Sequence, residues 1–118
     1  MINYRFGGCA TGKTFRLLRQ LSGKEYVVIY PFKYKAKNMT RFFEENKKHH
    51  YGDTSKAKVT TIADYMMGYC NDVDIVVIED FNDFISAIFR GKEVYININH
   101  KEERVKFIDV EKERKIEL

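Results

Sequence analysis

The sequence predicts an α/β fold, in which a mainly parallel β-sheet lies between two layers of helices. Two continuous apolar runs, at residues 26–30 and 75–78, are typical of strands that are buried on both faces of a sheet. Segments with helical spacing of apolar residues alternate with these runs. Such alternation builds parallel sheets with right-handed crossovers, and ligands bind them at the carboxyl ends of the strands.

The first part of the chain predicts two strand–helix units. Apolar and polar residues alternate over residues 2–6, as in a half-exposed strand, and a glycine-bearing loop over residues 7–14 follows. Helical spacing then predicts a helix that ends at the Ser-Gly pair 22–23. The run at 26–30 predicts a buried strand, and apolar residues at helical spacing over 36–43 predict the next helix.

The middle of the chain continues the alternation after a polar surface loop at residues 49–58. Residues 59–62 predict a strand, with a short helix over 63–69. The apolar run at 75–78 predicts the second buried strand. Phe81, Phe84, Ile85 and Ile88 follow the i, i+3, i+4, i+7 spacing of an amphipathic helix, and we therefore expect a helix there.

The C-terminal part predicts more strand than helix. Alternating apolar residues predict a strand at 94–98, and residues 104–110 predict another. We expect these two strands to pair across the turn at 100–103 as an antiparallel hairpin, whose exposed edge could support a homo-oligomer. The predicted organisation is one domain over residues 1–110, followed by a charged tail at 111–118.

Composition excludes several classes of protein. With 118 residues, 44% apolar residues and 32% charged residues, the chain is typical of one globular domain. It has no apolar run of the ~20 residues that span a bilayer and no signal-peptide pattern, so we expect no membrane partner. Two cysteines match no disulfide framework or zinc pattern, which favours a reduced, cytoplasmic location. A net charge of +4 permits an anionic partner.

The glycine-bearing loop carries the most specific motif. Its letters, G-G-C-A-T-G-K-T, fit the P-loop pattern G-x-x-x-x-G-K-[ST] between a predicted strand and a predicted helix. Backbone N–H groups of such a loop wrap a phosphate, and the following helix directs its N-terminus at the anion. We expect Lys13 to reach the β- and γ-phosphates of ATP and Thr14 to bind Mg²⁺. The predicted nucleotide-binding residues are Gly7, Gly8, Cys9, Ala10, Thr11, Gly12, Lys13 and Thr14.

Two carboxylates follow the second buried run. Glu79 and Asp80 come directly after residues 75–78, where a P-loop protein needs an acid for Mg²⁺. One carboxylate would hold a water molecule bound to Mg²⁺, and the other could polarise the attacking water. The predicted catalytic residues are therefore Lys13, Glu79 and Asp80, and the predicted metal residues are Thr14, Glu79 and Asp80. The alternative is a helix N-terminus that acidic residues stabilise.

The order of these motifs resembles the first RecA-like domain of superfamily-1 helicases of the UvrD/Rep type, in truncated form. Residues 78–84, I-E-D-F-N-D-F, resemble motif II of that family, I-D-E-A-Q-D-F. Residues 28–36 resemble its motif Ia, and residues 59–65, V-T-T-I-A-D-Y, resemble the strand that follows. With the P-loop, the resemblance covers roughly residues 2–90. It implies a three-layer, RecA-like P-loop NTPase fold that binds ATP and Mg²⁺.

The departures from the helicase pattern concern hydrolysis. The two acids of motif II are transposed, since Glu79 stands where the family has Asp and Asp80 where it has Glu. A G-D-x-x-Q motif is missing, and 118 residues leave no room for the second domain that supplies arginine fingers. Such a finger contributes on the order of a thousandfold or more in rate. The sequence therefore predicts a weak ATPase rather than a helicase, and its Lys-, Ile-, Tyr- and Asn-rich composition favours a phage or mobile element.

A basic, aromatic stretch follows the first buried strand. In the helicase comparison, the region of Lys33, Tyr34, Lys35 and Lys37 contacts single-stranded DNA. Aromatic stacking and phosphate contacts suit that role, so the expected partner is single-stranded DNA or a protein of replication, recombination or packaging. The alternative is a solvated helix face with Tyr34 packed inward.

Two further functions stay open. The transposed acids favour a catalytically inactive nucleotide-binding-fold module that binds or inhibits a partner protein. The chain also resembles P-loop thymidine kinases in its strand end at 75–80 and in His49-His-Tyr-Gly52, which is similar to their S-H-x-G loop. The zinc cysteines of that family are missing here, so a small nucleoside kinase is the weaker alternative.

Overall fold

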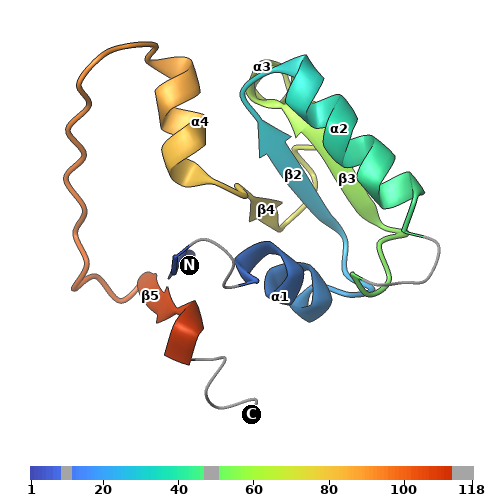
Figure 1. Cartoon of the computed structure of the whole chain (residues 1–118), viewed down its shortest axis with the longest axis horizontal. Coiled ribbons are helices and arrows are strands. Elements are labelled where there is room, and N and C mark those ends of the chain that lie inside the picture. Colours follow the sequence, from blue (N-terminus) through green and yellow to red (C-terminus); the bar gives the residue numbers. More distant parts are fainter. Residues whose placement is uncertain (9–11, 47–50, 113–118) are drawn as a thin grey trace.

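The computed structural model describes residues 1–8, 12–46 and 51–112. Strands and helices alternate along the chain, as the sequence predicts (Figure 1). In chain order the elements are β1 (Ile2–Phe6), α1 (Lys13–Gln20), β2 (Tyr26–Tyr30), α2 (Lys33–Glu44), β3 (Ala57–Thr61), α3 (Ile62–Met66), β4 (Val76–Val77), α4 (Phe81–Ile88) and β5 (Val105–Asp109).

The strands form two parallel sheets. A three-stranded sheet has the order β3-β2-β4, and β1 pairs with β5 in a two-stranded sheet. Every strand pairing among the described residues is parallel, with Tyr26 opposite Ala57 and Val27 opposite Val76 in the first sheet. The predicted α/β class with parallel strands is therefore confirmed. Parallel neighbours place the carboxyl ends of β2 and β4 at one edge of the sheet, so the residues after these strands lie together.

The side chains of β2 alternate between two apolar clusters. Tyr26 and Val28 are buried with Leu18 of α1 and Met39 of α2 on one face. Val27 and Ile29 are buried with Val73 and with Phe84 of α4 on the other face. Because successive strand residues point to opposite faces, helices must cover both sides of β2 for all these residues to be buried. The central strand thus anchors the helices that carry the candidate site.

The expected antiparallel hairpin at the C-terminus is wrong. β5 pairs in parallel with β1, in the register that places Ile2 opposite Val105. The rings of Tyr4 and Phe107 stack across this pair with their centroids 5.3 Å apart. Residues 94–98 form no strand, and all of residues 91–100 are exposed. Alternating apolar residues favour an extended backbone, but a strand also needs a partner edge. In this fold β5 pairs with β1 and leaves residues 94–98 without a partner strand among the described residues.

The second buried run is shorter and more exposed than its composition predicts. Only Val76 and Val77 form β4, and the exposed fractions of Val76 and Ile78 are 43% and 40%. A strand is fully buried only when it has neighbours on both edges and layers on both faces. β4 is an edge strand, and within the described part of the chain it pairs with β2 alone. Of the predicted tail, residues 113–118 lie outside the described residues.

The hydroxyl of Tyr26 gives a test of this core. The side chain is fully buried, and its hydroxyl has no hydrogen-bond partner among the residues that the structure describes. Burial raises the pKa of this phenol, and the charge of Asp53 adds to the effect. An unpaired buried polar group costs about 1–3 kcal/mol. Tyr26→Phe should therefore leave the free energy of unfolding in urea unchanged or raise it by about 1 kcal/mol, whereas a clear loss of stability would contradict this arrangement.

Across the described ranges, the structure contains no helix that is long and apolar enough to span a membrane.

Candidate functional site

The predicted phosphate-binding loop connects β1 to α1. Gly7 and Gly8 follow the end of β1, and α1 begins at Lys13. Gly12 stands at the N-cap of α1 with φ of 75°, a left-handed conformation that glycine adopts without steric cost. The strand–loop–helix order that the motif requires is therefore present. Cys9, Ala10 and Thr11 lie outside the described residues, as do His49 and His50 of the kinase-like segment.

The side chain of Lys13 folds back over the loop. Its Nζ atom donates to the backbone carbonyls of Gly7 and Gly8, each at 2.9 Å. An ammonium group has three protons, so these two bonds leave one donor for an anion. The positive charge and the N-terminal end of α1 act at the same place, and both favour a negatively charged ligand.

The structure brings Thr14 and Glu79 together across 65 residues of sequence. Thr14 Oγ1, in the first turn of α1, donates to Glu79 Oε1 at 3.3 Å. The second carboxylate oxygen, Oε2, accepts from the hydroxyl of Tyr30 at 2.5 Å. Tyr30 ends β2 and Glu79 follows β4, which are neighbouring parallel strands. Hydroxyl and carboxylate oxygens are the hard ligands that Mg²⁺ prefers, so this donor set fits the predicted metal.

Asp80 has a different role from its neighbour. It is the N-cap of α4, and its Oδ1 atom accepts from the backbone N–H of Asp83 at 3.0 Å. An N-cap side chain satisfies a helix N–H that has no partner within the helix. Of the two predicted metal residues after the second apolar run, the structure therefore places Glu79 at Thr14 and Asp80 in a helix cap.

This difference predicts distinct effects of substitution at Asp80. Asp80→Ala removes the cap and should lower the free energy of unfolding by about 1 kcal/mol, whereas Asp80→Asn keeps a capping oxygen and should lower it by less than half as much. Urea unfolding followed by circular dichroism measures both values. Equal losses for the two variants would show that the cap does not depend on the side-chain oxygen.

A small acidic cavity lies beside this pair of strand ends. It has a volume of about 230 Å³, and its walls include Tyr30, Glu79, Asp80 and Asp83. Asp83 forms an ion pair with Lys35, and this contact raises the pKa of the lysine. Within residues 1–8, 12–46 and 51–112, no three His, Cys, Asp or Glu side chains converge on a point where they could hold a metal ion. A Mg²⁺ ion at Thr14 and Glu79 would thus depend on phosphate oxygens for further ligands.

The predicted nucleic-acid residues divide into two groups. Lys33 and Lys37 are exposed, whereas Lys35 is turned to its ion pair with Asp83. Tyr34 is 60% exposed, which excludes the alternative of an inward-packed ring, and it stacks on Phe32 with centroids 6.0 Å apart. The guanidinium of Arg90 lies over the ring of Phe32, 5.2 Å from its centroid.

The sequence did not reveal the contacts that two residues of this region make. Tyr30 was part of an apolar run, and its hydroxyl contact becomes visible only when β2 and β4 are adjacent. Arg90 gave no signal as an aromatic partner, because its contact with Phe32 joins segments far apart in the chain.

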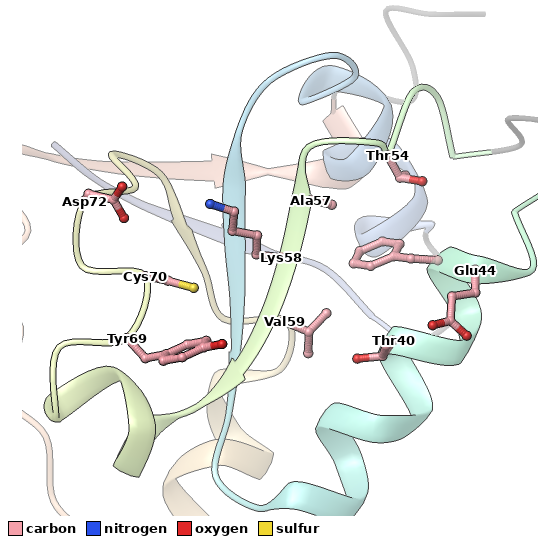
Figure 2. Close-up of a pocket in the computed structure, with 10 residues that line it drawn as sticks. Thr40, Glu44, Thr54, Ala57, Lys58, Val59, Tyr69, Cys70 and Asp72 are labelled. Atoms are coloured by element: carbon pink, nitrogen blue, oxygen red, sulfur yellow. The ribbon is translucent and has the colours of Figure 1, made fainter.

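A larger hollow lies elsewhere, at the edge strand β3 (Figure 2). Its volume is about 660 Å³. Figure 2 shows Thr40 and Glu44 of α2 on one side of β3 and Tyr69, Cys70 and Asp72 on the other. No residue of the loop at 7–14 and neither predicted acid lines it. This hollow is therefore separate from the candidate site.

Comparisons with protein-family models, with curated proteins and with solved structures found no match.

Proposed function

We propose that this chain binds ATP with Mg²⁺ through a RecA-like P-loop core and hydrolyses it at most slowly. The contact between Thr14 and Glu79 is the observation that carries the proposal, because it joins the start of α1, which follows the glycine loop, to the acid that follows β4 in the other sheet. Lys13 precedes Thr14 at the start of α1, and its Nζ atom donates to the carbonyls of Gly7 and Gly8. A hydroxyl and a carboxylate in contact, with an ammonium on the preceding residue, match the groups that Mg²⁺ and a triphosphate need.

In this proposal each residue has a defined part. Backbone N–H groups of the loop at 7–14 and the N-terminus of α1 bind the phosphates. Lys13 exchanges its carbonyl contacts for β- and γ-phosphate oxygens. Thr14 and Glu79 would hold Mg²⁺, directly or through a water molecule, and the bound ion would neutralise phosphate charge.

The position of Asp80 favours a protein that binds ATP over one that hydrolyses it. The carboxylate that would polarise the attacking water is engaged as the cap of α4. This supports the second candidate, a nucleotide-binding module without catalytic activity that binds or inhibits a partner protein. In both cases the bound nucleotide would alter the affinity for that partner.

The surface next to the site is suited to single-stranded nucleic acid. Lys33, Lys37 and the ring of Tyr34 are exposed, and Tyr34 stacks on the half-buried Phe32, which also contacts Arg90. An exposed aromatic ring on which a base can stack, with cations that contact phosphates, is the combination that binds single strands with little sequence preference. We therefore propose that the partner is single-stranded DNA or a protein that processes DNA, as in a phage or other mobile element.

Steady-state ATP hydrolysis, with and without single-stranded DNA, separates the two candidates. Slow turnover that DNA accelerates and Lys13→Ala abolishes would support the enzyme. Nucleotide binding without turnover would support the inactive module. Absence of both binding and turnover would contradict the proposal, and transfer of phosphate from ATP to thymidine would replace it with a nucleoside kinase.

A further inference from the structure

Tyr30 supplies the second of two hydroxyl groups that hold the carboxylate of Glu79. Tyr30 Oη donates to Oε2 at 2.5 Å, and Thr14 Oγ1 donates to Oε1 at 3.3 Å. Each carboxylate oxygen thus has its own donor, from a different element of the fold. Two donors at opposite oxygens fix both the position and the plane of a carboxylate, whereas a single donor leaves it free to rotate.

We propose that Tyr30 is a positioning residue that holds Glu79 in the orientation required to bind Mg²⁺ beside Thr14. This inference rests on the proposed function of the site. It assigns to the tyrosine no contact with nucleotide or metal, because its hydroxyl acts only through the carboxylate.

The surroundings of Tyr30 make it a rigid support. The residue ends the buried central strand, and its ring packs against the cluster that contains Leu18 and Val28. Glu79, in contrast, is exposed and stands after the short edge strand β4. A flexible glutamate loses side-chain entropy when it binds a metal. A hydrogen bond from a rigid neighbour orders the side chain before the metal binds, so less entropy is lost on binding.

The hydrogen bond from Tyr30 to Glu79 is of a strong type, because its acceptor is a carboxylate. Hydrogen bonds from a hydroxyl to a carboxylate are shorter and stronger than those between neutral groups. An ordinary phenol is protonated at neutral pH, so Tyr30 can donate this bond there.

The test compares Tyr30→Phe with a matched control, Tyr95→Phe. Tyr95 also donates to a glutamate, Glu93, at 2.8 Å, but on an exposed segment outside the site. The readout is binding of a fluorescent ATP analogue, measured over a range of Mg²⁺ concentrations and in EDTA. We expect Tyr30→Phe to raise the half-saturating Mg²⁺ concentration about 3- to 10-fold, the effect of one lost hydrogen bond, with affinity in EDTA within about twofold of wild type. Tyr95→Phe should change neither value.

A second substitution tests whether Tyr30 acts through Glu79. In a Glu79→Ala background, Tyr30→Phe should have no further effect on the Mg²⁺ dependence. An unchanged Mg²⁺ dependence in Tyr30→Phe would overturn the inference, provided that wild type shows Mg²⁺-dependent binding. Equal weakening with Mg²⁺ and in EDTA would also overturn it, because it would show a structural role for the hydroxyl. If wild type binds no nucleotide, the proposed function itself fails.

Discussion

Lys13→Ala is expected to weaken the binding of Mg²⁺–ATP by about 100-fold. The ammonium is the only side-chain cation that the structure places on the carbonyls of the glycine loop, among the described residues. Hydrogen bonds between charged groups contribute about 1.5–3 kcal/mol, and about 1.4 kcal/mol corresponds to a factor of ten in affinity. Isothermal titration calorimetry or a fluorescent ATP analogue measures the change.

The matched control for this variant is Lys24→Ala. Lys24 is exposed in the turn between α1 and β2, so its removal changes the net charge equally without touching the loop. Circular dichroism must show that both variants are folded. An affinity of Lys13→Ala within about threefold of the control would show that the triphosphate does not bind at this loop.

Leu18→Ala is expected to lower the free energy of unfolding by about 2–5 kcal/mol, as is usual for a truncated core leucine. Leu18 is 1% exposed and belongs to the cluster that joins α1 to β2. The same helix carries Lys13 and Thr14 in its first turn, so this cluster also supports the candidate site.

Ile96→Ala is the matched control for the core variant. The residue is 50% exposed on the segment that was expected to be a strand. Surface substitutions without special contacts change stability by about 0.5 kcal/mol or less, and urea unfolding compares the two variants directly. A loss at Ile96 as large as that at Leu18 would mean that residues 94–98 are buried in solution, contrary to the fold described above.

The alternation of strands and helices could be predicted from the sequence because apolar spacing reports local periodicity. The same spacing does not report how many neighbours a strand has. Residues 26–30 and 75–78 have similar composition, yet the first run forms the central strand and the second forms a short edge strand. The pairing of β5 with β1 likewise depends on which edge is open, and no local pattern contains that information.

The candidate site shows the same limit at the level of single residues. The glycine-loop motif fixed the position of Lys13 and Thr14, since both lie within a few residues of one turn. Glu79 and Asp80 could not be separated, because adjacent residues at a strand end have the same sequence signal. The fold separates them, since α4 begins at once and takes Asp80 as its cap. The contact of Tyr30 with Glu79 could be found only once β4 was known to lie beside β2.

Calorimetric titration of ATP into the pure protein tests the central claim most directly, in buffer with Mg²⁺ and again with EDTA. We predict saturable heat with about one site per chain, tighter binding when Mg²⁺ is present, and binding about 100-fold weaker in Lys13→Ala. No heat of binding at millimolar ATP with Mg²⁺, from protein that is folded by circular dichroism, would contradict the account.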